Sequence, residues 1–185
     1  MRGRGSARAL QPTRHARNER MLIAGMSERF AVKDCSDGIA ALWRRFAPCV
    51  GNLVGQVGDA AYGVRYDTEQ PGEMEYLCAV EVANFSSVPR NFTLMCIPAQ
   101  RCAVFLHRGS VASVRTTWDG IHDSWLPGSG QICVGTPFER YGPSFDPHAG
   151  TGGVEVWIPV APRNRADELA ASLTRHRFAS EGLGA

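Results

Sequence analysis

The feature that most constrains the fold is an internal duplication, because the same order of predicted elements occurs twice. Patterns of apolar residues predict strand, helix, strand and strand in each half of the chain. These elements are expected over residues 20–26, 38–50, 60–68 and 73–85, and again over residues 101–107, 111–126, 136–145 and 154–160. The spacing of about 75 to 80 residues, with only two copies, indicates a duplicated β-α-β-β unit rather than a solenoid.

Two such units predict an α+β fold. Tandem duplicated β-α-β-β repeats would form one antiparallel sheet, with two helices on one face and a groove between the repeats. Asp37 and Ser110 are placed to cap the helices, and Pro127 with Gly128 is expected to end the second one. Small ligands commonly bind in a groove at such a junction, so the groove is the expected place for a binding site.

The two ends of the chain differ in composition from its centre. We predict one domain over residues 20–162, with repeat one at about 20–85 and repeat two at about 92–162. Residues 1–19 are expected to form a disordered basic leader, with Met21 as an alternative start of the protein, and 163–185 a polar C-terminal tail. Six arginines crowd the first twenty positions: Arg2, Arg4, Arg8, Arg14, Arg17 and Arg20.

Charge and cysteine usage narrow the class of protein. The formal net charge of +2 is too small to indicate a nucleic-acid-binding surface. No apolar run approaches the ~20 residues of a transmembrane helix, and none is long enough for a signal peptide. The six cysteines lie mostly within apolar runs and show no metal-ligand spacing. We therefore expect reduced cysteines in a cytoplasmic protein that holds no metal and no cofactor.

Two glutamates stand among apolar and aromatic residues, Glu139 in the stretch TPFERYGPSF and Glu155 in GGVEVWIPV. A buried carboxylate is costly unless it is paired, so each acid is expected to be exposed, paired or available to a positive group. When the two halves are superposed as AYGVRYD over TPFERYG, Glu155 matches Glu75, whereas Glu139 matches the apolar Val64. Glu155 can thus have a structural role shared by both halves, and Glu139 is the acid without a counterpart.

Strand alternation predicts which side chains share a face. Glu139 and Tyr141 fall on one face of their strand, and Glu155 and Trp157 share a face opposite the valines of theirs. A carboxylate beside aromatic rings suits an organic cation, because each ring adds a cation–π attraction of ~0.5–2 kcal/mol. The candidate ligand-binding residues are Glu139, Tyr141, Trp157, Trp118, Glu155, Phe105, Tyr66 and Trp125. The alternatives are an exposed Glu139 paired with an arginine, and tryptophans that belong to the core.

The stretches LIAGMSERF, AYGVRYD, TTWDGIHDSWLPGSG, PFERY and FDPHAGTGGVEVWIPV carry a resemblance that covers about residues 20–162. The chain resembles the GyrI-like small-molecule-binding family, which is related to the effector-binding domains of AraC-type and multidrug-sensing transcription regulators. The resemblance implies two β-α-β-β repeats with a groove that binds lipophilic, often cationic, compounds through a glutamate among aromatic residues. That glutamate corresponds to Glu139, with Tyr141, Trp118 and Trp157 as its implied neighbours.

Three classes of function follow. The first is a stand-alone binding module that senses or sequesters a cationic or aromatic small molecule, without sequence-specific DNA binding and without a membrane partner. The second is a hydrolase of electrophilic toxins, an activity that the resemblance implies for some relatives. Glu139 would be its general base and Tyr141 its acid. The third is an interaction protein that acts on a regulator or a topoisomerase, with the basic leader as a possible point of contact.

Overall fold

The structure is a computed structural model that describes residues 10–33 and 35–164, so the predictions for residues 1–9 and 165–185 lie outside the described residues. The strands are β1 (Arg14–Asn18), β2 (Met21–Ala31), β3 (Gln56–Asp67), β4 (Glu73–Val82), β5 (Thr93–Ile97), β6 (Gln100–His107), β7 (Gln131–Cys133), β8 (Phe138–Tyr141) and β9 (Val154–Pro162). The helical segments are α1 (Cys35–Phe46), η1 (Ala47–Cys49), η2 (Val111–Ser113), α2 (Val114–Gly120), η3 (Ile121–Trp125) and α3 (Leu126–Gly128).

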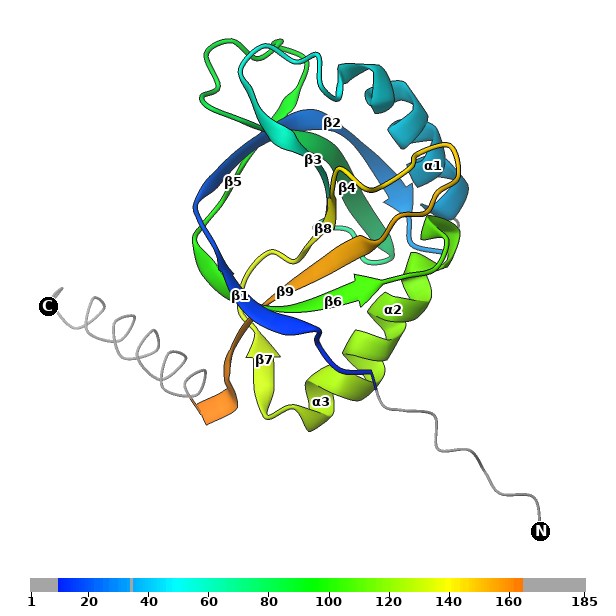
Figure 1. The fold of residues 1–185 in the computed structure, drawn as a ribbon. Helices are drawn as coiled ribbons and strands as arrows, with labels where there is room; N and C mark the ends of the chain where they lie inside the picture. Colours follow the sequence, from blue (N-terminus) through cyan, green and yellow to red (C-terminus); the bar gives the residue numbers. More distant parts are fainter. Residues whose placement is uncertain (1–9, 34, 165–185) are drawn as a thin grey trace, which may run out of the picture.

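All nine strands belong to one antiparallel sheet, with the order β1-β6-β9-β8-β3-β4-β2-β5 and with β7 added beside β9. The ladder between β1 and β6 ends at the pair Asn18 and Gln100, and the ladder between β2 and β5 begins at the pair Met21 and Ile97. Met21 lies three residues after Asn18, and Ile97 lies three residues before Gln100. The two ladders are therefore one register with a short break. Because β1 leads into β2 and β5 into β6, the sheet curls into a closed ring of strands (Figure 1).

Strand alternation divides the apolar side chains between the inside and the outside of this ring. The inner cluster contains Met21, Ile23, Ala60, Tyr62, Val64, Leu77, Ala79, Ile97, Cys102, Val104, Phe138 and Trp157. On the outside, α1 packs over a cluster that includes Tyr76 and Tyr141, and η3 packs over a cluster that includes Phe105 and Val156. Both helical layers cover the outer face (Figure 1), which confirms the predicted α+β fold with its helices on one face of the sheet.

The second helical segment is longer and less regular than expected. Ser110 does cap its first turn, since its hydroxyl accepts a hydrogen bond from the backbone N–H of Ala112 at 3.4 Å. The chain then runs through α2, a π-helical turn at η3 and a last turn at α3, so the helix does not end before Pro127. π-Helical turns are rare and often occur at functional sites. In the first helix Asp37 lies in the first turn, after the helix has begun at Cys35, and not at the cap position.

The prediction of a disordered leader over residues 1–19 is wrong for residues 14–18, which form β1 and pair with β6 from Arg14↔Val104 to Asn18↔Gln100. The side chain of Asn18 is buried and donates a hydrogen bond of 2.9 Å to the backbone carbonyl of Pro98, across the break between β5 and β6. The apolar periodicity used to predict strands is missing from β1, because its side chains are mostly polar and its backbone pairing needs no apolar side chains. The short strands β5 and β7 were likewise not expected.

None of the helices in residues 10–33 and 35–164 is long and apolar enough to span a membrane.

Candidate ligand-binding site

Glu139 lies on β8, on the outer face of the ring and between the two helical layers. Its side chain is only 5% exposed. The hydroxyls of Tyr76 and Tyr141 each donate a hydrogen bond of 2.6 Å to Oε2, and the indole Nε1 of Trp118 donates one of 2.7 Å to Oε1. Both oxygens are therefore acceptors, as an ionised carboxylate requires.

Three segments that are distant in sequence bring these donors together. Tyr76 comes from β4, Tyr141 from β8 itself and Trp118 from α2. Gly63 of β3 pairs with Glu139 across the β3–β8 ladder, and its missing side chain leaves the necessary room. A Cβ atom at Gly63 would lie 2.0 Å from the hydroxyl of Tyr76 and 2.8 Å from Oε2 of Glu139.

Aromatic rings surround the carboxylate beyond its direct partners. Trp43 of α1 meets Tyr141 edge to face, with 4.8 Å between ring centroids, and its indole N–H donates to the hydroxyl of Tyr76 at 3.4 Å. Phe145 also packs edge to face against Tyr141, with 4.9 Å between ring centroids. On α2, the ring of His122 stacks on Trp118 at 5.8 Å. Trp43 and Trp118 are half-buried, so both helices contribute an aromatic ring between the carboxylate and solvent.

The electrostatic surroundings of Glu139 are unusual for a buried acid. Within the described residues no arginine, lysine or histidine forms an ion pair with it, so its charge is balanced by neutral donors alone. Burial, followed by the nearby charge of Glu139, raises the pKa of Tyr76 and of Tyr141 well above the ordinary value for a phenol. Burial and the same charge also raise the pKa of the Cys78 thiol. These three groups therefore stay protonated and uncharged at neutral pH.

The residue-by-residue match of the two halves needs a correction. Val64 belongs to the cluster inside the ring, whereas Glu139 faces outward, so the two residues are not equivalent positions. The predicted register was off by an odd number of residues, which exchanges the faces of a strand. The outward positions of β3 beside the carboxylate are Ala61 and Gly63, which carry no charge.

Glu155 and Trp157 do not lie beside Glu139, because they point to the inner side of the ring. The guanidinium of Arg14 forms an ion pair of 2.6 Å with Glu155 and lies 5.3 Å from the ring centroid of Trp157. Arg140 adds a second ion pair of 3.5 Å to Glu155, and Trp157 Nε1 donates a hydrogen bond of 3.1 Å. Partial burial acts to raise the pKa of Glu155, but hydrogen bonds from Arg14 and Trp157 and the charges of both arginines hold it below its ordinary value.

The remaining candidate ligand-binding residues, Phe105, Trp125 and Tyr66, do not contact Glu139 either. Phe105 and Trp125 pack edge to face at 4.8 Å in the outer cluster under η3, and Tyr66 lies at the inner cluster. Only Glu139, Tyr141 and Trp118 of the predicted set are thus brought together. Sequence reasoning missed Tyr76, Trp43 and Gly63, although the alternation of the stretch EMEYLCAV does place Tyr76 on the same face as the buried Cys78 and Val80.

An antiparallel sheet with helical layers on one face is the α+β architecture of a small-molecule-binding domain, as the family match shows. The family model described as the GyrI-like small molecule binding domain matches residues 18–161, and the chain belongs to this family. The resemblance drawn from the sequence is therefore confirmed.

Relatives agree with this assignment. The chain is 30% identical to the transcriptional regulator BrlR of Pseudomonas aeruginosa over 131 residues, which cover 67% of this chain and 47% of that protein. The chain thus spans about half the length of this curated relative. Among solved structures, SAV2435 bound to tetraphenylphosphonium has a TM-score of 0.63 and 19% identity, covering 80% of this chain and 93% of that one. The C-terminal domain of EcmrR has a TM-score of 0.58 and 21% identity, with 80% and 96% covered.

Proposed function

We propose that this domain binds lipophilic cations at Glu139, between α1 and α2. The observation that carries the proposal is a buried carboxylate that the described residues balance only with neutral donors. Such a group attracts a cation more strongly than an exposed acid does, because the low local dielectric strengthens the interaction. The tetraphenylphosphonium bound to SAV2435, a protein of the same fold, is a ligand of this chemical class.

In the structure the carboxylate is closed, so a ligand has to replace one of its partners. Trp118 is the most exposed of the three donors, since it is half-buried while Tyr76 and Tyr141 are 5% and 6% exposed. Among the residues that the structure describes it is also the single donor to Oε1, and it lies in α2, three residues before the π-helical turn begins at Ile121. We infer that the indole of Trp118 moves aside, and that the ligand's cation then takes its place among Trp43, Tyr76 and Tyr141. Aromatic substituents on the ligand would stack on the displaced indole.

The test measures quenching of tryptophan fluorescence during titration with tetraphenylphosphonium and with tetraphenylborate, which has the same shape and the opposite charge. The wild-type protein should prefer the cation. Glu139→Gln should weaken cation binding about tenfold or more, corresponding to at least ~1.4 kcal/mol, and should leave the anion unaffected.

The matched control is Glu155→Gln, which removes the other predicted acid from the opposite face of the sheet. It should leave binding of the cation unchanged. Two results would show that Glu139 does not supply the charge. One is an equal loss of affinity for the cation and the anion in Glu139→Gln, and the other is a loss of cation affinity only in Glu155→Gln.

A further inference from the structure

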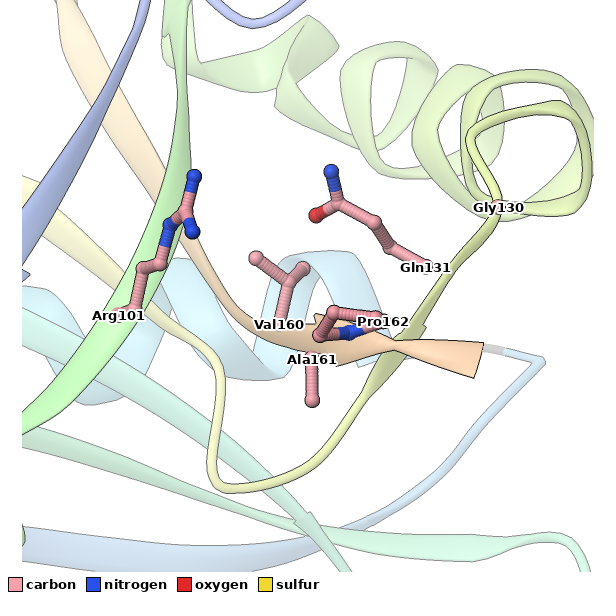
Figure 2. Close-up of a pocket in the computed structure, with 6 residues that line it drawn as sticks. All are labelled: Arg101, Gly130, Gln131, Val160, Ala161 and Pro162. Atoms are coloured by element: carbon pink, nitrogen blue, oxygen red, sulfur yellow. The ribbon is translucent and has the colours of Figure 1, made fainter. Parts of the chain in front are cut away.

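A second site lies away from Glu139, where β1, β6, β7 and β9 meet. One pocket of about 310 Å³ is lined by Arg101, Gly130, Gln131, Val160, Ala161 and Pro162 (Figure 2). An adjoining pocket of about 340 Å³ is lined by His15, Ala16, Arg17 and Arg101. Arg101 belongs to both, so its guanidinium connects the two spaces. Neither pocket includes a residue that contacts Glu139, which makes this site independent of the proposed cation site.

The charge at this site is positive and concentrated. Arg17 and Arg101 are paired directly opposite each other in the β1–β6 ladder, and both are exposed. Like charges in such cross-strand positions destabilise a sheet. No aspartate or glutamate among the described residues forms an ion pair with either guanidinium. An anion held between the two would remove this repulsion.

Gln131 supplies an independent reason to expect a ligand. Its side-chain oxygen is buried and has no hydrogen-bond partner, which is costly for a polar atom. In Figure 2 this oxygen lies on the side of the amide that faces Arg101. The guanidinium of Arg101 can only donate hydrogen bonds. The amide of Gln131 is therefore expected to turn its accepting oxygen, and not its donating NH2 group, toward Arg101. The buried Val160 and the adjacent Pro162 give the pocket an apolar wall.

From this combination we propose that the Arg101 pocket binds a small organic anion that also carries an O–H or N–H donor, such as an aromatic hydroxycarboxylate. The carboxylate pairs with Arg101 and Arg17, and the apolar body packs on Val160 and Pro162. The amide of Gln131, whose oxygen is buried before binding, turns toward the pocket and accepts a hydrogen bond from the donor. A guanidinium holds a carboxylate through two parallel hydrogen bonds, which fixes the orientation of the ligand. The domain would then accept ligands of opposite charge at two separate places.

The test is a ligand-observed NMR titration of the full chain with 3-hydroxybenzoate. Benzoate, which lacks the donor, and 3-hydroxybenzyl alcohol, which lacks the charge, are the comparison compounds. 3-Hydroxybenzoate should bind saturably and more tightly than either. Arg101→Gln should weaken it about tenfold, whereas Arg65→Gln, which removes an exposed arginine from β3, should have no effect.

Gln131→Met keeps the length of the side chain and removes the acceptor. It should weaken the binding of 3-hydroxybenzoate about fivefold and leave the binding of benzoate unchanged. Arg101→Gln should fold normally, because it relieves the repulsion with Arg17, and an unchanged or higher melting temperature checks this. The proposal is overturned by absence of saturable binding, by equal losses in Arg101→Gln and Arg65→Gln, by equal affinity for the uncharged alcohol, or by equal losses of both acids in Gln131→Met.

Discussion

Glu139 and Glu155 lie on neighbouring strands and on opposite faces of one sheet, yet their partners differ in kind. Glu155 is half-buried and has two arginines beside it, while Glu139 is buried and accepts hydrogen bonds from two tyrosines and a tryptophan. An acid with cationic partners is already neutralised and serves the structure. An acid held by neutral donors alone has no counter-charge among the described residues, and the proposed cation site rests on this feature. The difference lies in the partners rather than in the burial of the acid alone.

The largest expected effect comes from filling the space beside Glu139. Gly63→Ala places a methyl group 2.0 Å from the Tyr76 hydroxyl, so the tyrosine or the carboxylate has to move. We expect the free energy of unfolding to fall by about 3 kcal/mol, as for other overpacked cores, measured by urea denaturation. Gly142→Ala is the control, because its new Cβ would be in ordinary contact, 3.6 Å from Arg140 Nη1. Equal stability of both variants would mean that the carboxylate is loosely held.

A smaller loss of stability is expected when one tyrosine hydroxyl is removed from either face of the sheet, and the size of the loss should differ between the two faces. Tyr141→Phe deletes a hydrogen bond of 2.6 Å to the carboxylate of Glu139 and should cost about 2 kcal/mol, since bonds to charged groups are the strong ones. Tyr62→Phe deletes a 3.5 Å contact between an equally buried tyrosine and Glu81, and should cost less than about 0.5 kcal/mol because long bonds are weak. Chemical denaturation measures both. Equal losses of unfolding free energy in Tyr141→Phe and Tyr62→Phe would show that the hydrogen bond to Glu139 is no stronger than the one to Glu81.

A third effect, smaller than the loss in Tyr141→Phe, concerns Glu155 and depends on pH. Its pKa is lower in the folded protein than in the unfolded chain, so its contribution to stability is present above the ordinary pKa of 4.5 and is lost as the pH falls through the folded value. Glu155→Gln should therefore cost about 0.5–1 kcal/mol at neutral pH, and less as the solution becomes acidic.

Thermal unfolding of Glu155→Gln and wild type between neutral and acidic pH measures this loss. Glu69→Gln, which changes an exposed acid between β3 and β4, serves as the control. If the difference between Glu155→Gln and wild type stays constant down to acidic pH, the ion pairs with Arg14 and Arg140 do not stabilise the fold.

Much of the fold and the central acid of the candidate site were predictable from sequence. Apolar periodicity located both helices and the long strands, and alternation assigned the correct faces to Tyr141 and to Trp157. The sequence could not place Tyr76 or Gly63 beside Glu139, because those contacts depend on the β3–β8 pairing between the two halves. A one-residue ambiguity in aligning the halves was enough to match Glu139 with an inward-facing valine. Strand β1 escaped detection because its side chains are mostly polar and its stabilisation comes from backbone pairing.

The continuous register from β1–β6 into β2–β5 has a mechanical consequence for ligand entry. In a closed ring, no strand can slide without shifting every ladder around the circumference, so the wall that carries Glu139, Tyr76 and Tyr141 is expected to stay fixed. The outer helices are attached to the sheet through side-chain packing, so we expect them to move more readily than the strands. Compounds of different sizes would therefore be accommodated by displacement of the outer helices. The position of the Glu139 carboxylate would remain the same for all of them.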